Sequence, residues 1–244
     1  MKRSNILLIA FFSLVFVSIL YLYITAKNNE KQNSSNIVKS EYALPPFSVV
    51  VAESGSQVSI QLSDSSSLVT RFVGVEKDSK KPFIVRNDTL FILANKTNQS
   101  IIKQPDIYYG KGVFIDLYCK SVNAVVGKAN SRVNIQHSSL DSLSVLSLGG
   151  LMSVNANDNS TDSNTSECSY IVSACKGGSV DFSGIKMSSL MIELDSAKMI
   201  VTKSDIIDLQ AALKNKSDLK LIYLDTAPNN INVSKQDSST FKIY

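Results

Sequence analysis

The sequence predicts an all-β protein, a single-stranded β-solenoid (β-helix) of short strands, preceded by one N-terminal transmembrane helix. Two observations predict the β fold: apolar and polar residues alternate within short segments, and these segments recur about every ten residues. A third predicts the helix, because a long apolar run lies near the N-terminus. With 44% hydrophobic residues and only 10 Gly and 5 Pro among 244 residues, the remainder has the composition of a globular domain.

The N-terminal run, ILLIAFFSLVFVSILYLYI at residues 6–24, contains 19 residues and no charge. As a helix it would cross a bilayer, because about 20 residues at a rise of about 1.5 Å each cover about 30 Å of hydrocarbon. Lys2 and Arg3 precede it, so we expect a cytoplasmic N-terminus (residues 1–5) and a single-pass signal anchor in the cytoplasmic membrane (residues 6–24). A cleaved signal peptide is the alternative. Either way, the body is expected in the periplasm or extracellular space.

A polar segment follows, KNNEKQNSSNIVKSEY at residues 27–42, with few large apolar residues. Such a composition is typical of a flexible stalk, which we assign to residues 25–44. Pro45 and Pro46 then precede the first alternating segment, so the exported β-solenoid domain is expected at residues 45–244.

The repeat is clearest in the first inward apolar residue of each short segment. The series runs Val113, Val122, Val133, Leu143, Val154, Ile171, Val180, Leu190, Met199, Leu209 and Leu219. Its steps are 9 to 11 residues except for one of 17, where the polar stretch at residues 155–168 predicts a loop inserted at a corner. Two strands per coil of about 20 residues would stack Val180, Met199 and Leu219 in one file, and Leu190 on Leu209 in another.

An antiparallel sandwich or barrel is the alternative source of such a rhythm. Three features favour the solenoid. The hairpin dipeptides Asn-Gly and Asp-Gly are absent, the strands are very short, and Ser, Lys, Gly and Asn separate them as expected for tight corners.

Charge and cysteine content exclude several functions. Residues 1–40 hold five basic residues and one acidic residue, which accounts for the whole net charge of +4, so the neutral body is not expected to bind nucleic acid. The spacing of the 3 cysteines gives no zinc site. Cys119 continues an inward apolar phase and should be buried, whereas Cys168 and Cys175 could pair after export.

Catalytic patterns are lacking, so we expect a protein that is not an enzyme and has no catalytic residue, metal or cofactor. The sequence contains a single histidine, His137, and no G-x-S-x-G nucleophile-elbow motif with which it could form a catalytic triad. The alternative is a carbohydrate-active enzyme that uses surface aspartates, with Asp181 approaching the Asp195–Asp208 region.

Two segments are candidate ligand-binding sites. A tyrosine pair at residues 108–109 could stack on a sugar ring, and the polar loop could hydrogen-bond a glycan. The candidate residues are Tyr108, Tyr109, Asn157, Asp158, Asn159 and Asp162.

The segment FSVVVAESGSQVSIQLSDSSSLV, the strand DTLFILA and the Ser- and Gly-punctuated repeat together resemble the bacterial head GIN domain family, which carries an auto-transporter adhesin label. The resemblance covers roughly residues 44–243. It implies an exported right-handed β-helix, and it brings no catalytic residues because the family has none established.

These observations together predict a non-enzymatic protein of the cell envelope that presents a β-solenoid for adhesion, ligand binding or scaffolding. Its expected partners are the membrane, through residues 6–24, and a protein or glycan on the solenoid face. A structural subunit of an envelope protein complex is the remaining alternative.

Overall fold

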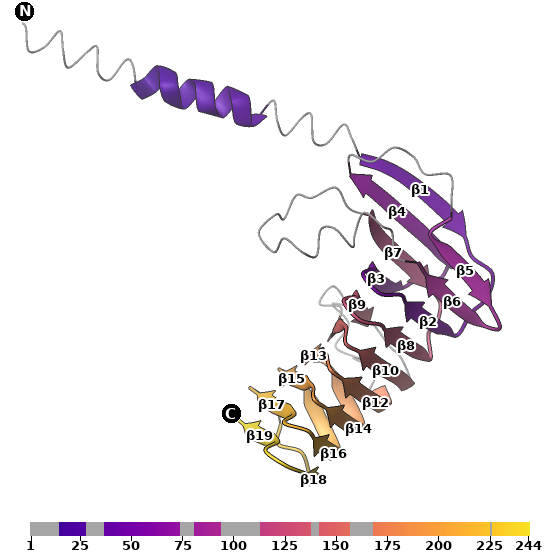
Figure 1. Cartoon of the computed structure of the whole chain (residues 1–244), viewed down its shortest axis with the longest axis vertical. Coiled ribbons are helices and arrows are strands. Elements are labelled where there is room, and N and C mark those ends of the chain that lie inside the picture. The colour runs from indigo at the N-terminus through magenta and orange to yellow at the C-terminus, as the bar shows by residue number, and fades with distance from the viewer. Residues whose placement is uncertain are drawn as a thin grey trace, which may run out of the picture.

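The computed structural model describes residues 15–27, 37–73, 81–93, 113–137, 142–156, 168–224 and 226–244. Within these ranges the chain forms one helix, at residues 15–27, and two large β-sheets that face each other across a common core (Figure 1). The prediction of a mostly β protein is therefore confirmed.

Hydrogen bonds between neighbouring strands define the spatial order within each sheet. The ten-stranded sheet contains, from one edge to the other, β1 (Ile37–Ala43), β4 (Ser67–Val73), β7 (Val113–Cys119), β3 (Gln57–Leu62), β9 (Arg132–His137), β11 (Leu151–Ala156), β13 (Ser179–Ser183), β15 (Lys198–Thr202), β17 (Asp218–Ile222) and β19 (Thr240–Ile243). The nine-stranded sheet contains, in the same sense, β18 (Asn230–Lys235), β16 (Asp205–Lys214), β14 (Lys186–Asp195), β12 (Cys168–Lys176), β10 (Ser142–Leu148), β8 (Ala124–Gly127), β2 (Val49–Ala52), β6 (Thr89–Ile92) and β5 (Phe83–Arg86).

From β8 onward, successive strands alternate between the two sheets. From β10 onward, each strand pairs in parallel with the strand two places before it, as β13 does with β11 and β14 does with β12. The register aligns Val180 with Met199 and Met199 with Leu219, and it aligns Leu190 with Leu209. Both predicted files are therefore observed, with a repeat of 19 or 20 residues.

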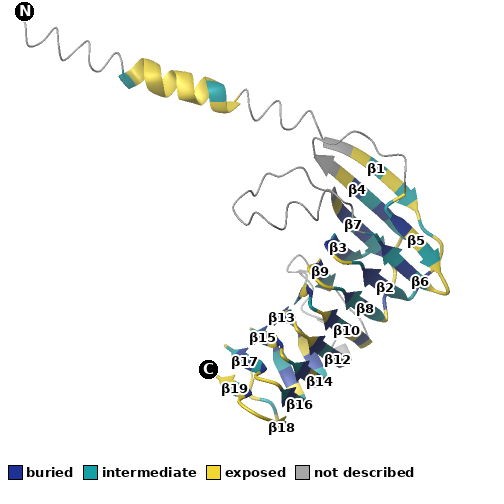
Figure 2. Ribbon diagram, viewed as in Figure 1, coloured by how far each residue is buried: buried dark blue, intermediate teal, exposed yellow. Residues whose placement is uncertain are grey.

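The apolar positions of the predicted series form the core. Leu143, Ile171, Val180, Leu190, Met199, Leu209 and Leu219 are at most 1% exposed, and buried positions alternate with more exposed ones along strands such as β13 and β15 (Figure 2). One detail differs from the predicted series: Met152, not Val154, aligns with Val180, and Val154 aligns with Phe182 instead.

The corners between strands depend on small residues. At Gly178 an added Cβ would lie 2.4 Å from the carbonyl oxygen of Gly150, so only glycine fits where two corners stack. Buried serines occupy the equivalent corners further along, where the hydroxyls of Ser204, Ser217 and Ser239 accept hydrogen bonds from backbone N–H groups at 3.2–3.3 Å. The GGSV segment at residues 177–180 is thus a corner and the start of β13.

The N-terminal part of the body departs from this parallel pattern. β4 pairs antiparallel with both β1 and β7, and β5 and β6 form an antiparallel hairpin. The hairpin turn consists of Asn87 and Asp88, with φ of 47° and 62°. Asn and Asp tolerate the left-handed conformation that such turns require, so the absence of Asn-Gly and Asp-Gly did not exclude a hairpin.

The predicted stalk at residues 25–44 is wrong for residues 37–43, which form β1. This strand pairs with β4 over its whole length. Tyr42 packs edge-on against the ring of Phe83, with 5.5 Å between ring centroids, and contacts the core. Tyr42 and Leu44 thus gain burial that a stalk would not provide, so the folded body begins before residue 45.

The helix at residues 15–27 exposes its apolar side chains; Phe16 and Tyr21, for example, are 65% and 69% exposed. Among the described residues, no helix has both the length and the apolar character needed to cross a membrane. Residues 6–14 of the predicted anchor lie outside the described ranges.

A disulfide between Cys168 and Cys175, which the sequence left open, is incompatible with the strand that holds them. Both lie in β12, seven residues apart, and seven residues of extended strand span about 23 Å, whereas a disulfide needs Cα atoms within about 7 Å. Cys175 is free and buried. Cys119 is 1% exposed as predicted, and burial raises the pKa of its thiol to about 11.

Candidate functional site

The residues that the sequence singled out for ligand binding all lie outside the described ranges. These are Tyr108, Tyr109, Asn157, Asp158, Asn159 and Asp162. Their role stays a prediction, and the described residues present a different site.

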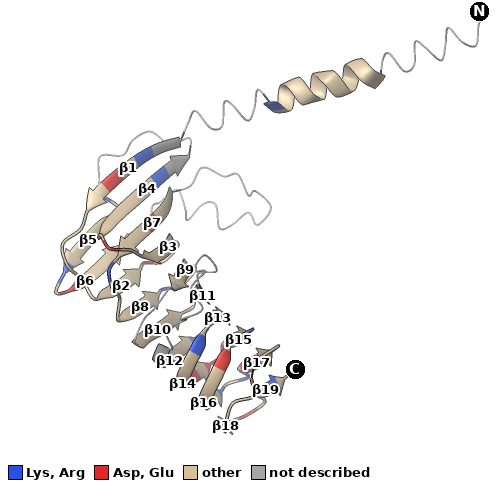
Figure 3. Ribbon diagram, turned by 180° about the vertical axis from the view of Figure 1, so that it is seen from behind, with Lys and Arg blue, Asp and Glu red and all other residues tan. Residues whose placement is uncertain are grey.

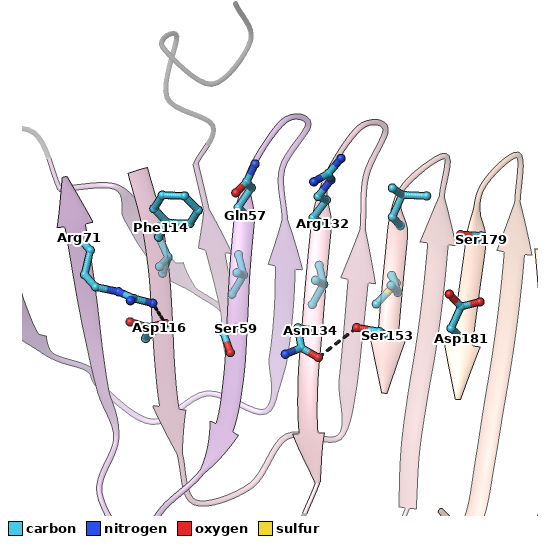
Figure 4. A pocket seen from close by; sticks show the side chains of 15 residues that line it. Gln57, Ser59, Arg71, Phe114, Asp116, Arg132, Asn134, Ser153, Ser179 and Asp181 are labelled. Carbon is cyan, nitrogen blue, oxygen red and sulfur yellow. Dashed lines mark hydrogen bonds and ion pairs between the residues drawn. The ribbon is translucent and has the colours of Figure 1, made fainter. Parts of the chain in front are cut away.

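That site is a hollow of about 430 Å³ on the outer face of the ten-stranded sheet. It crosses six neighbouring strands: β4, β7, β3, β9, β11 and β13 (Figure 4). We call it the outer-face hollow. Its outward-pointing side chains are those of Gln57, Ser59, Arg71, Phe114, Asp116, Arg132, Asn134, Leu151, Ser153, Ser179 and Asp181.

The floor of the hollow is a row of short polar side chains that the register aligns across five strands. Ser59 pairs with Asp116 on one side and with Asn134 on the other, and the row continues through Ser153 to Asp181. Successive strands lie about 4.8 Å apart, so this polar row is about 19 Å long.

Cross-strand hydrogen bonds fix the middle of the polar row. The hydroxyl of Ser153 donates to Asn134 Oδ1 at 3.0 Å, and the amide of Asn155 donates to the same oxygen at 2.9 Å. In the adjacent row, Gln61 Nε2 donates to Gln136 Oε1 at 2.8 Å. Asn134 Oδ1 therefore accepts two hydrogen bonds. No described residue accepts a hydrogen bond from Asn134 Nδ2, so this group remains available as a donor in the hollow.

Charge within the hollow is balanced. Arg71 donates to Asp116 Oδ1 at 2.8 Å at one end of the polar row. Arg132 is exposed and forms no ion pair with any described residue. The hollow thus holds two guanidinium groups and two carboxylates, of which Arg71 and Asp116 are paired and Arg132 and Asp181 are not.

Asp181 lies at the other end of the polar row and has no hydrogen-bond or ion-pair partner among the described residues. The residue is exposed overall, yet the surrounding side chains partly desolvate its carboxyl group and so raise its pKa. An unpartnered carboxyl group of this kind is available to accept hydrogen bonds from a ligand.

An apolar rim lies beside the polar row, one outward position closer to the start of the strands. Phe114 and Leu151 project there and are 39% and 49% exposed. Gln57 on β3 and Arg132 on β9 follow Phe114 in the same row (Figure 4), and the register aligns Leu151 with Arg132. The hollow therefore combines an ordered polar floor with two exposed apolar side chains.

The geometry does not support the alternative of a glycosidase that uses surface aspartates. Asp181 belongs to the ten-stranded sheet, whereas Asp195 and Asp208 belong to the nine-stranded sheet. Within the hollow, Asp116 and Asp181 are about 19 Å apart along the sheet, and the two carboxyl groups of a glycosidase are about 5–9.5 Å apart. The described ranges also contain no cluster of three or more His, Cys, Asp or Glu residues that could hold a metal ion.

The aspartates on the nine-stranded sheet are engaged in structural contacts. Asn215 Nδ2 donates to Asp195 Oδ1 at 2.7 Å, which with help from Ser196 and nearby lysines lowers the pKa of Asp195. Asn230 Nδ2 donates to Asp208 Oδ1 at 2.7 Å.

Sequence reasoning missed Asn134 and Ser153, which are central to the hollow. Each occupies an ordinary outward position of a short strand, without a motif. The 20-residue coil does contain a signal, since the two residues are 19 positions apart and fall in one row once the strands are stacked.

Comparison with solved structures shows that this fold has been seen before. The chain is similar to a protein of Bacteroides fragilis named a putative adhesin, with a TM-score of 0.55 and 14% identity over 87% of this chain and 99% of that one. A putative adhesin of Parabacteroides merdae (TM-score 0.37, 11% identity, 86% and 96% covered) and a putative lipid binding protein of Parabacteroides distasonis (0.35, 12%, 86% and 97%) are more distant. At these identities only the first likeness is informative, and it shows a shared fold.

No protein-family model matches the chain, and no curated protein matches its sequence. Membership of the head GIN domain family, which the sequence suggests, therefore stays a prediction.

Proposed function

We propose that the chain is a non-enzymatic binding protein of the cell envelope, and that its outer-face hollow holds an extended glycan. The observation that carries this proposal is the ordered polar row from Asp116 to Asp181 beside the apolar rim of Phe114 and Leu151.

A glycan matches this surface because each sugar hydroxyl both donates and accepts hydrogen bonds. Asn134 Nδ2 and the guanidinium of Arg132 can donate to it, and the carboxyl group of Asp181 can accept from it. The apolar face of a sugar ring can pack on Phe114, as apolar ligand surfaces do on aromatic rings.

Other ligand classes fit less well. An ionised phosphate diester only accepts hydrogen bonds, so it would leave the unpartnered carboxylate of Asp181 without a donor. A peptide that adds to a sheet needs a free edge, whereas the hollow covers the face of strands that are already paired on both sides.

The proposal includes a β-solenoid architecture and export. The alternation of strands between two parallel sheets, at 19 or 20 residues per turn of the chain, supports the solenoid. The apolar run at residues 6–24 supports an N-terminal anchor with the body outside the cytoplasmic membrane.

A glycan array tests this function directly. The full chain, in mild detergent, is applied to an array of neutral, acidic and amino-sugar oligosaccharides, and the affinity for each bound glycan is then measured by biolayer interferometry. We expect Asn134→Ala and Asp181→Ala each to weaken binding about threefold to tenfold, because each removes one or two hydrogen bonds. Asn232→Ala is the matched control, since Asn232 is an exposed strand amide in β18 of the other sheet.

The absence of any bound glycan would contradict the proposal. Binding that Asn134→Ala leaves unchanged would place the site elsewhere on the chain.

A further inference from the structure

The outer face of the nine-stranded sheet carries a feature that the glycan proposal does not use. One outward position on each of six neighbouring strands is apolar, and the register joins these positions into a single row from β5 to β12. The members of this apolar row are Ile84, Phe91, Val51, Val126, Leu146 and Ala174.

Strand alternation shows that the row points away from the core, although Val51 itself is only 8% exposed. Val50 and Val125 belong to the buried core cluster, whereas their neighbours Val51 and Val126 do not. Because successive side chains of a strand point to opposite faces, Val51 and Val126 lie on the outer face. Ile84 is 39% exposed at the β5 end of the row.

The strands at the centre of the row are apolar on both faces. β2 reads VVVA and β8 reads AVVG, and neither these strands nor β10 contain a charged residue (Figure 3). Strands with continuous apolar runs are typical of sheets covered on both sides, whereas a sheet with one solvated face usually alternates. An outer face of this composition indicates a surface that another molecule covers.

Opposite charges lie near the two ends of the row. At the β5 end, Arg86 lies one outward position along the strand from Ile84, about 7 Å from the row; it is exposed and forms no ion pair with a described residue. The row continues past Ala174 to Glu193 on β14, whose side chain is 64% exposed and lies 3.7 Å from Lys214. Just past the ends of β2 and β8, Glu53 and Lys128 already pair with each other at 2.8 Å.

We propose that the apolar row is the interface of a two-fold symmetric dimer with a second copy of this chain. β8 is the fourth of the seven strands from β5 to β14, so a two-fold axis parallel to the strands at Val126 brings the row onto itself in reverse. Ile84 of one copy then faces Glu193 of the other, and Arg86, one outward position along β5, approaches the same carboxylate. Phe91 then faces the small Ala174, and Val51 faces Leu146.

The other principal two-fold axis, parallel to the row, is disfavoured by charge. It would place Glu193 against Glu193, and like charges in contact oppose association. The ends of the row therefore select the axis that lies along the strands.

The size of the surface suggests a weak dimer. Seven strands at about 4.8 Å and three outward rows at about 7 Å give roughly 700 Å² on each copy. Stable interfaces bury about 800 Å² per partner, so association should depend on local concentration. The dimer does not require that the opposite face bind a glycan.

Cross-linking of the full chain in the membranes of expressing cells tests the dimer. Val126→Cys places a thiol at the proposed axis, and Ile200→Cys places one at a partly exposed outward position of the other sheet. All variants carry Cys168→Ser, and the native Cys119 and Cys175 are buried. A short bismaleimide is the reagent, because sheets that pack about 10 Å apart hold the thiols too far apart for a disulfide.

We expect a cross-linked dimer from Val126→Cys and none from Ile200→Cys. Equal yields from the two variants, or no dimer from Val126→Cys, would overturn the proposal.

A charge exchange tests the orientation. In the Val126→Cys background, Arg86→Glu and Glu193→Arg should each lower the dimer yield about fivefold, because each replaces two attractive contacts per dimer with repulsive ones. The combination of both substitutions should restore the yield. A combined variant that cross-links no better than the single ones would rule out the proposed axis.

Discussion

The two outer faces of this molecule share one core and one strand rhythm, yet they differ in chemistry. On the ten-stranded sheet the outward row from Asp116 to Asp181 is polar and hydrogen-bonded, whereas the outward row from Ile84 to Ala174 on the nine-stranded sheet is apolar. Inward positions are constrained by packing, so the outward positions are free to specify what each face contacts. One face therefore suits a hydrated ligand, and the other suits a protein surface.

The largest expected effect comes from the core that both faces share. Phe182 is fully buried between the sheets and is the neighbour of Asp181 on β13. Phe182→Ala should lower the free energy of unfolding by about 3–5 kcal/mol, because it removes a large apolar side chain and leaves a cavity. Chemical denaturation measures this. A loss below about 1 kcal/mol would show that the two sheets are not packed on each other at this position.

The next effect separates the two faces. Val126→Thr with Leu146→Thr should abolish the dimer and leave glycan binding intact, because both side chains point outward from the nine-stranded sheet. Asn134→Val with Ser153→Val should abolish glycan binding and leave the dimer intact. Cross-linking and biolayer interferometry on both double variants measure the two properties. Loss of both properties in either variant would mean that the faces are not independent.

Hydrogen bonding on the polar face should also contribute to stability. Asn134 Oδ1 accepts from both Ser153 and Asn155, so Asn134→Ala should lower the free energy of unfolding by about 1–2 kcal/mol. Asn232→Ala, at an exposed amide of β18, should change it by less than about 0.5 kcal/mol. Equal losses in the two variants would indicate that the polar row is not preordered.

Two acids on the ten-stranded sheet should respond oppositely to pH, and Asp218 is the first. Hydrogen bonds from Thr240 and Lys220, with the charge of nearby lysines, lower its pKa. Its stabilising effect is therefore present at neutral pH and is lost as the pH falls through the lowered pKa. Thr240→Val should reduce the melting temperature at neutral pH but much less in strong acid, below the lowered pKa. An equal reduction in melting temperature at neutral pH and in strong acid would refute this explanation.

Asp181, inside the hollow, is the second acid and gives the smallest effect. Partial burial raises its pKa, so the folded state holds the proton more tightly than the unfolded state does, and stability falls as the pH rises through that range. Asp181→Asn should therefore raise the melting temperature slightly at neutral pH and have no effect in strong acid, where the carboxyl group is protonated in both states. A lower melting temperature at neutral pH would mean that Asp181 has a stabilising partner.

The sequence predicted the inward half of this structure well and the outward half poorly. Files such as Val180, Met199 and Leu219 follow from apolar periodicity, because burial leaves few choices at those positions. The strand at residues 37–43 was missed because only Tyr42 and its short alternation distinguish it from a linker. The antiparallel pairing around β4 was also missed, because it depends on contacts between segments distant in the sequence.

The outer-face hollow could not be predicted in the same way. Asn134, Ser153 and Asp181 are ordinary polar residues on separate strands, and only the register between those strands makes them neighbours. The apolar row was equally hidden, since VVVA at β2 was interpreted as an alternating strand with one buried face.

Hydrogen–deuterium exchange with and without a bound oligosaccharide tests the account most directly. The glycan identified on the array is added to the full chain in excess, and exchange is followed by mass spectrometry for every peptide. We predict slower exchange in peptides that cover β3, β9, β11 and β13, with no change in β8 and β10. Protection confined to the segments around Tyr108 and Tyr109, or around Asn157 to Asp162, would contradict the assignment of the outer-face hollow as the binding site.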